Sequence, residues 1–319
     1  MKRMRHFREF ESDTMLRVSW RHVKKSRASM RRASTLQVCD TIESYRKVRG
    51  SIAPGATVGF VPTMGGLHAG HLSLIQEARK RCDVVVASVF VNPAQFGPNE
   101  DFEKYPRTLE ADLALLRQEN VDIVFTPARD SMYSSSFRTY VDPEGFNDVP
   151  EGQCRPGFFR GVATIVAKLF NIVAPTHAFF GQKDAVQCVV IKRVIADLNF
   201  PIELHVLDTC REPSGLAMST RNQYLTPQER QASAVIFAGL KQAADVFAAA
   251  TAATVPASVL RATIEKVYKS EPRLQSIQYI SIASKETMDE LDDVSKDQGA
   301  IISVAVKVGQ CRLIDNIVL

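Results

Sequence analysis

The sequence predicts an α/β fold, a doubly wound parallel sheet followed by a smaller C-terminal α+β domain. Short apolar runs at 58–61, 83–91 and 121–125 alternate with amphipathic helical segments. This alternation is typical of parallel strands that are buried between helices. After residue 208, helical segments are grouped together and strand-like runs follow them, which is typical of an α+β arrangement.

The composition is that of a globular protein, because 45% of the 319 residues are hydrophobic and 24% are charged. No uninterrupted apolar run approaches the roughly 18 residues that span a bilayer, so we expect no membrane association. The six cysteines are scattered and form no C-x-x-C pair. They therefore predict reduced thiols in an intracellular, cytoplasmic protein.

The net charge of +5 is unevenly distributed along the chain. Residues 1–35 hold eleven of the 40 basic and three of the 35 acidic residues, which leaves 29 bases and 32 acids in the remainder. The Arg- and Ser-rich segment resembles a mitochondrial transit peptide, although its three acidic residues argue against one. A disordered extension, or a start at Met15 or Met30, explains it equally well. We divide the chain into this extension, a domain over 36–208 and a domain over 209–319.

The first strand and the turn after it contain the most informative stretch. An amphipathic segment (41–48) leads through Pro54-Gly55 into the strand 58–61. Glycines follow at 65, 66 and 70, and a helical pattern begins at His71. A strand, a glycine-rich turn and a helix direct backbone N–H groups and the helix dipole towards an anion.

Two histidines, His68 and His71, lie three residues apart where this helix begins. The spacing places both rings on one side of the turn, where they could bond a phosphate. The stretch contains neither a Walker loop nor a dinucleotide fingerprint. A zinc pair is the weaker alternative, because no third ligand lies nearby in the sequence, and an ordinary βα turn with incidental histidines is the simplest.

Later elements continue the alternation. The strand 83–91 ends in Asn92-Pro93-Ala94-Gln95-Phe96, and Thr108 begins a helix. Residues 129–160 are predicted to be loop, and a helix begins at Gly161. We then expect, in order, a strand at 178–180, the turn Gly181-Gln182-Lys183-Asp184, a helix that carries Gln187, a strand at 202–207, the loop 215–222, helices at 226–249 and 256–270, and strands at 277–283 and 300–308 with a terminal hairpin.

Three phosphate-binding features follow separate strands: the histidine pair, Lys183, and Ser219-Thr220-Arg221. Each alone is commonplace, but together they suit a triphosphate. Gln95 and Gln187 are expected at the ends of neighbouring strands, where uncharged amides could orient a small polar substrate. An apolar wall beside them is predicted from Pro62, Met64, Phe96, Val162, Ile165 and Val166, although the valines suit a plain core equally well.

Seven ordered motifs over residues 36–319 resemble those of the pantothenate synthetase (pantoate–β-alanine ligase) family. They are P-T-M-G-G-L-H-A-G-H (62–71), V-F-V-N-P-A-Q-F (89–96), Y-P-R-T-L (105–109), R-P-G-F-F-R-G-V-A-T-I-V (155–166), F-G-Q-K-D-A-V-Q (180–187), G-L-A-M-S-T-R-N-Q-Y-L (215–225) and R-L-I-D-N (312–316). This family belongs to the adenylate-forming superfamily whose synthetase relatives carry a H-I-G-H motif, with a Rossmann-like, nucleotidyltransferase-type fold.

The resemblance implies a ligase that uses ATP with Mg²⁺, pantoate and β-alanine, forms a pantoyl adenylate and acts as a homodimer. It implies a catalytic set of His68, His71, Lys183, Ser219 and Arg221, with His71 as proton donor. ATP would be held by Met64, Gly65, Gly66, Leu67, His68, Ala69, Gly70, His71, Gly181, Gln182, Lys183, Asp184, Cys210, Met218, Ser219, Thr220 and Arg221. Pantoate would contact Gln95 and Gln187.

The sequence departs from the family pattern at four places. Phe158 replaces a usual histidine, Gln182 a usual glutamate and Ser214 a usual aspartate, while Gly66 and Ala69 are smaller than the usual residues. A nucleotidyltransferase of the same superfamily is the main alternative. A nucleic-acid-binding or tethering protein that acts through the basic tail is a remote one, because that tail lacks interleaved aromatic residues.

Overall fold

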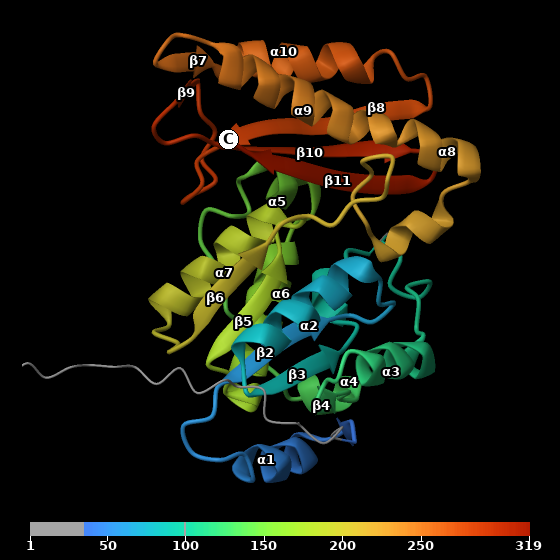
Figure 1. Cartoon of the computed structure of the whole chain (residues 1–319), viewed down its shortest axis with the longest axis vertical. Coiled ribbons are helices and arrows are strands. Elements are labelled where there is room, and N and C mark those ends of the chain that lie inside the picture. The colour runs from blue at the N-terminus through green and yellow to red at the C-terminus, as the bar shows by residue number, and fades with distance from the viewer. Residues whose placement is uncertain (1–34, 99) are drawn as a thin grey trace, which may run out of the picture. The chain divides into compact units, whose positions relative to one another are not determined.

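A six-stranded parallel sheet organises the first two thirds of the computed structural model, which describes residues 35–98 and 100–319 (Figure 1). Predictions for residues 1–34 lie outside the described residues. The strands follow the order β1-β4-β3-β2-β5-β6. Their bounds are Gln37–Cys39 (β1), Val58–Thr63 (β2), Val84–Val89 (β3), Ile123–Phe125 (β4), His177–Gly181 (β5) and Glu203–Leu207 (β6). The predicted doubly wound parallel sheet is confirmed.

Helices cover both faces of this sheet. On one face, α2 (Ala69–Arg81) and α3 (Leu109–Gln118) bury an apolar stripe that includes Ile75 and Leu116. On the other face, α1 (Ile42–Gly50), α6 (Phe158–Val173) and α7 (Ala185–Asp197) pack over Phe60 and Phe125. Apolar burial on both faces explains why the strands read as continuous hydrophobic runs.

Two predictions between residues 129 and 161 differ from the structure. Helix α6 begins at Phe158 rather than Gly161, because Gly157 has a left-handed backbone (φ 78°) that allows the helix to begin directly after it. The segment 129–160, predicted to be loop, contains the short helices α4 (Arg129–Met132) and α5 (Pro150–Cys154). Proline at the first position of α5 suits a helix start and also resembles a turn signal.

The C-terminal part has the predicted α+β character. Helices α8 (Pro227–Ala232), α9 (Ala234–Ala249) and α10 (Ala257–Tyr268) precede an antiparallel sheet ordered β11-β10-β8, with bounds Cys311–Val318, Ile301–Val308 and Leu274–Ala283. A small pair, β7 (Thr254–Pro256) with β9 (Asp293–Ser295), was not predicted. The predicted helix 226–249 is two helices, α8 and α9, with Ser233 between them.

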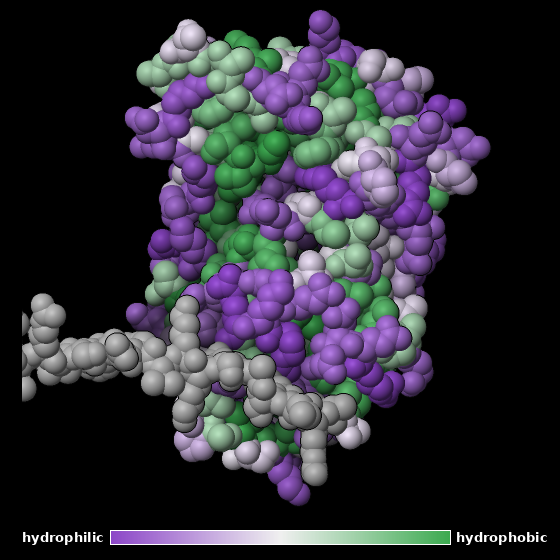
Figure 2. Space-filling model, viewed as in Figure 1, coloured by the Kyte–Doolittle hydropathy of each residue, from purple (hydrophilic) through white to green (hydrophobic). Residues whose placement is uncertain are grey.

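One segment of the described residues, Pro227–Ala249, is long and apolar enough to cross a membrane by length and composition. Its residues Ile236, Leu240 and Ala243 are buried in the C-terminal core, and a core helix passes the same test. Figure 2 shows that the viewed face is mainly polar, with hydrophobic side chains in small groups. The six cysteines are free, and four of them are buried.

Close contact between α6 and the short helix η1 (Pro93–Gln95) leaves no room for a side chain at Gly161. A Cβ there would lie 2.0 Å from the backbone oxygen of Ala94. We expect Gly161→Ala to lower the free energy of unfolding by about 1–3 kcal/mol, the usual cost of overpacking. The matched control is Gly50→Ala at the end of α1, where a Cβ meets nothing within 4 Å. Equal urea midpoints for both variants would contradict the close packing.

Candidate active site

A pocket lies at the carboxyl ends of the parallel strands, where open α/β sheets bind ligands. It brings together the three predicted phosphate-binding features, which are the histidine pair after β2, Lys183 after β5 and Ser219 to Arg221 after β6. All of the predicted pantoate-binding residues line the same pocket: Pro62, Gln95, Phe96, Val162, Ile165, Val166 and Gln187. Residues far apart in the sequence therefore face one cavity.

Sequence reasoning missed the role of Asp112 on α3, whose carboxylate binds the glycine-rich turn. Asp112 is 2% exposed and accepts the backbone N–H groups of Gly66 and Leu67 at 3.0 and 2.8 Å. Thr108 also donates to this carboxylate rather than capping α3. These two N–H groups were expected to face a phosphate. A ligand would have to displace Asp112 to use them, so side chains are the better candidates for phosphate contacts.

The two histidines also satisfy N–H groups at the start of α2, which begins at Ala69 rather than at the predicted His71. Gly70 N–H donates to His68 Nδ1 at 3.2 Å, and His68 N–H donates to His71 Nδ1 at 3.3 Å. Each Nδ1 is therefore an acceptor, so the proton of each neutral ring lies on Nε2. The ring centroids are 4.1 Å apart.

Burial keeps both histidine rings neutral. Burial, helped by the charge of Lys183, lowers the pKa of His68 to about 4. Burial and the neighbouring His68 and Lys183 lower the pKa of His71 to about 3. At neutral pH both rings can donate a hydrogen bond from Nε2 but carry no surplus proton. This state favours charge stabilisation over the proton-donor role that the resemblance implies for His71.

The small residue at Gly66 is explained by its contact with the loop that follows β6. Thr220 donates from Oγ1 to the Gly66 carbonyl at 3.1 Å. A Cβ on Gly66 would lie 2.5 Å from Thr220 Cγ2, and the φ of +62° also favours glycine. Glycine at position 66, one of the departures from the family pattern, therefore allows the two candidate phosphate loops to contact each other.

Lys183 is positioned by the C-terminal sheet. Asn316 on β11 donates from Nδ2 to the carbonyls of Gln182 and Lys183 at 2.8 and 2.9 Å, and Gln182 donates to Asn316 Oδ1. The Lys183 ammonium lies 3.9 Å from Asp184, which is a long ion pair. The R-L-I-D-N motif near the C-terminus therefore supports the turn that carries the cation. The Asn316 amide of this motif was visible in the sequence, but no role was assigned to it there.

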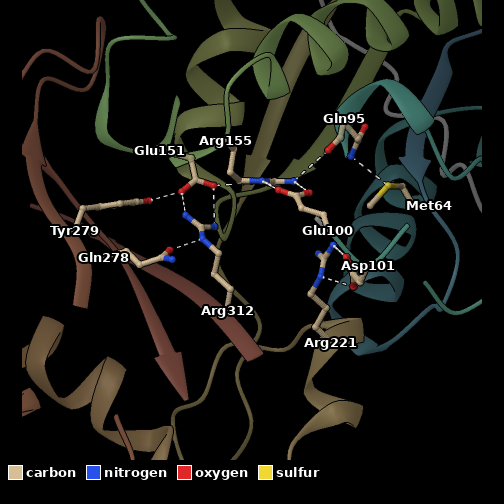
Figure 3. Close-up of polar contacts among 10 residues, drawn as sticks. All are labelled: Met64, Gln95, Glu100, Asp101, Glu151, Arg155, Arg221, Gln278, Tyr279 and Arg312. Carbon is tan, nitrogen blue, oxygen red and sulfur yellow. Dashed lines mark hydrogen bonds and ion pairs between the residues drawn. The ribbon is translucent and has the colours of Figure 1, made fainter. Parts of the chain in front are cut away.

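Arg221 forms a two-pronged ion pair with Asp101 at the rim of the pocket (Figure 3). The guanidinium donates to both carboxylate oxygens, at 2.9 and 2.7 Å. Such pairing is among the stronger charge-assisted contacts. Phosphate oxygens of a ligand would have to compete with Asp101 for Arg221, and sequence reasoning did not identify this carboxylate.

Gln95 is oriented by neighbours to which sequence reasoning assigned no such role. The buried Asn92 donates from Nδ2 to Gln95 Oε1 at 3.0 Å, which turns the Gln95 amide nitrogen towards Met64 Sδ (Figure 3). Arg155 donates to the Gln95 carbonyl and binds both oxygens of Glu100. The Arg155 guanidinium also stacks 3.6 Å from the ring centre of Phe158, where the family usually has histidine. Phe158 therefore braces an arginine at the pocket wall.

The two glutamines approach the pocket from strands that are not neighbours, contrary to our prediction. Gln95 follows β3 and Gln187 follows β5, and β2 lies between these strands. The amides therefore flank Pro62 and Thr63 at the end of β2. Val162, Ile165 and Val166 are at most 4% exposed and belong to the α6 core while also lining the pocket, so both interpretations of these residues apply.

The predicted ATP-binding set divides into three groups. Those that line the pocket are Met64, His68, Gly70, His71, Gly181, Lys183, Asp184, Cys210, Met218, Ser219, Thr220 and Arg221. Gly66, Leu67 and Ala69 line an adjoining hollow that shares Met218 to Thr220 with the pocket. Gly65 and Gln182 line neither cavity, because Gly65 lies against Asp112 and Gln182 bonds Asn316.

Comparison with known proteins relates nearly the whole described chain to one family. The sequence pattern of Pantoate-beta-alanine ligase matches residues 37–318. Pantothenate synthetase of Chloroflexus aggregans is 48% identical over 281 residues, which cover 88% of this chain and 99% of the relative. Pantothenate synthetase of Pelotomaculum thermopropionicum is 49% identical over 283 residues, covering 88% and 98%.

Solved structures show the same relationship. Pantothenate synthetase from Thermus thermophilus superposes with a TM-score of 0.80 at 40% identity, covering 88% of this chain and 98% of that structure. Pantoate-beta-alanine ligase from Francisella tularensis, complexed with beta-gamma ATP and beta-alanine, gives a TM-score of 0.72 at 33% identity, covering 89% and 98%.

The low histidine pKa values predict a loss of stability in acid. An unfolded histidine binds a proton near pH 6.5, whereas folded His68 and His71 resist protonation down to about pH 4 and 3. Between these values the unfolded chain binds more protons, so the free energy of unfolding should fall as the pH falls from 6.5 towards 4. The variant His68→Gln,His71→Gln should show a shallower decline in urea titrations. An unchanged slope would show that the rings titrate normally.

Proposed function

This chain belongs to the pantoate–β-alanine ligase family, and from that premise we propose which of its residues bind ATP and pantoate and stabilise the transferring charge. The enzyme condenses pantoate with β-alanine in an ATP-dependent reaction. Pantoate's carboxylate attacks the α-phosphorus of ATP, which gives pantoyl adenylate and pyrophosphate. The amine of β-alanine then attacks the acyl carbon, and AMP leaves as pantothenate forms. The convergence of the histidine pair, Lys183 and Arg221 on one pocket carries the proposal.

Charge moves onto the pyrophosphate in the first step, so oriented donors and cations near the α-phosphorus accelerate it. We assign this role to the Nε2–H groups of His68 and His71 and to the ammonium of Lys183. Ser219 and Arg221 suit the β- and γ-phosphates, with Arg221 released from Asp101 as ATP binds. This assignment uses neutral histidines as hydrogen-bond donors, in agreement with their low pKa values.

The adenosine part of ATP would extend towards the β5 and β6 ends of the pocket. Asp184 suits the ribose hydroxyls and Cys210 the adenine, because both line the cavity beside Lys183 and Met218. Mg²⁺ would enter with ATP as part of the substrate. The carboxylate of Asp208 also lines the pocket, and carboxylate oxygens are ligands that Mg²⁺ accepts.

Pantoate carries two methyl groups beside a hydroxyl and a carboxylate. The apolar side chains of Pro62, Val162 and Val166 suit its methyl groups. Gln95 and Gln187, on either side of β2, can bond the hydroxyl and carboxylate without placing a like charge beside the attacking anion. The Asn92 contact holds the Gln95 amide in one orientation for this purpose.

We propose further that residues 36–208 bind the substrates and that residues 209–319 form a lid, because the loop 218–221 faces the pocket from beyond β6. Closure of this lid would shield the adenylate from water. We also propose a cytoplasmic homodimer. The bacterial relatives lend no support to a mitochondrial location.

The stepwise scheme is tested by positional isotope exchange in ATP. Exchange should occur with pantoate present and β-alanine absent, because the first step does not involve the amine. Lys183→Met keeps the length of the side chain, removes its charge and should slow exchange by about 10²–10³, the cost of losing one oriented charge stabiliser. Exchange that requires β-alanine would contradict the adenylate intermediate, and full exchange in Lys183→Met would contradict the lysine assignment.

Substitutions at Gln187 test the pantoate site. Gln187→Glu should raise the KM for pantoate more than Gln187→Ala does, because it adds repulsion towards the pantoate carboxylate besides removing a donor. The KM for ATP should change little in either variant. Steady-state kinetics with each substrate varied would reveal the difference. A milder effect from Glu than from Ala, or equal losses for both substrates, would place Gln187 away from pantoate.

A further inference from the structure

Two histidines and a glutamate meet at the edge of the parallel sheet opposite the pocket. His177 is the first residue of β5, Glu203 is the first residue of β6 and His205 is its third. The pocket, in contrast, is built at the carboxyl ends of these strands. His177 is paired in register with Glu203, and His205 lies two residues further along β6. All three side chains therefore project from the same face of the sheet.

The donor atoms of these residues are spaced as a metal ion requires. His177 Nδ1 lies 3.1 Å from His205 Nε2 and 3.5 Å from a carboxylate oxygen of Glu203. His205 Nε2 lies 3.3 Å from the other carboxylate oxygen. Bonds of about 2.0–2.1 Å in a tetrahedral zinc site place neighbouring ligand atoms about 3.3 Å apart. The three distances between the donor atoms lie close to this value, on both sides of it.

The surroundings hold the cluster in place. His205 stacks on Phe179 with ring centroids 4.7 Å apart. The side chains of His177 and His205 are only 19% and 12% exposed, whereas Glu203 is 63% exposed and can reorient towards an ion. Arg81, a basic side chain whose charge acts on His205, is paired with Glu77 at 2.6 Å.

We propose that His177, Glu203 and His205 form a binding site for a divalent transition metal, with zinc as the best match, outside the catalytic pocket. Two imidazoles and a carboxylate suit zinc, whereas Mg²⁺ and Ca²⁺ prefer oxygen ligands alone. The exposed side of Glu203 leaves a fourth position for water. The ion ties the edge strand β6 to β5 and therefore stabilises the fold without taking part in the ligation.

The alternative arrangement is a direct hydrogen bond between the two rings, with one nitrogen as donor and the other as acceptor. This hydrogen bond needs no ion, and Glu203 then lies beside the pair of rings. The two arrangements differ in metal stoichiometry, and metal analysis therefore distinguishes them.

The experiment uses the full chain purified without a histidine tag, stripped with EDTA and equilibrated with one to two equivalents of Zn²⁺. After gel filtration, elemental analysis should find one zinc per chain. With zinc at about 100 times its dissociation constant, the Tm should rise by about 5 °C. Co²⁺ in place of zinc should give the intense visible absorption of a tetrahedral site. A stoichiometry near zero would overturn the proposal in favour of the hydrogen-bonded pair.

Variants locate the ion. Glu203→Gln alters an exposed side chain, and His205→Phe keeps the stacking on Phe179 while removing the nitrogen. Each should weaken zinc binding at least tenfold, because even the loss of an outer-shell partner costs 10–100-fold. His68→Gln,His71→Gln is the matched control, since it removes the other described histidine pair and should keep one zinc. Zinc retained in Glu203→Gln and His205→Phe but lost in the control would place the ion in the catalytic pocket and overturn the proposal.

Discussion

Two adjacent side chains on β11, Asp315 and Asn316, hold the segments that bring positive charge to the pocket. Asp315 is 3% exposed and binds Arg211 through both oxygens at 2.6 and 2.9 Å, which anchors the start of the loop that ends at Arg221. Asn316 binds the turn that carries Lys183. Removing one partner of a buried ion pair typically costs about 3–5 kcal/mol. The position of the cations therefore depends on the C-terminal sheet, although most of the pocket belongs to the parallel sheet.

The second constraint on the chemistry is that backbone N–H groups around the glycine-rich turn already have hydrogen-bond partners. Asp112, His68 and His71 accept the N–H groups of the glycine-rich turn and the helix start. A helix start of this kind usually offers such groups to an anion. Here the turn is preorganised by its own side chains, and in the proposed function the Nε2–H groups of the histidines contact the phosphate instead. The same hydrogen bonds determine the tautomers, so the folding of the turn also sets the donor geometry of the site.

Charges at the rim of the pocket are paired in the structure. Arg221 is bound to Asp101, and Arg155 is bound to Glu100 and stacked on Phe158. Glu151 extends this network to Arg312 and Tyr279 of the C-terminal sheet (Figure 3). Paired guanidiniums lower the cost of burying charge around an apolar pocket. In the proposed function, an incoming triphosphate replaces Asp101 as the partner of Arg221, which would couple ATP binding to the loop that carries this arginine.

The sequence by itself determined the α/β class, the order of strands β2 to β6 along the chain and most of the motifs that line the pocket. Apolar periodicity and glycine-rich turns are local patterns that a short stretch of sequence reveals. A parallel sheet brings the carboxyl ends of its strands to one edge, however far apart the strands lie in the sequence. Only the tertiary structure decided that β2 separates Gln95 from Gln187, that Asp112 takes the N–H groups of Gly66 and Leu67, and that His177 meets His205. These contacts depend on strand order and side-chain packing between distant segments, and a local pattern carries no information about either.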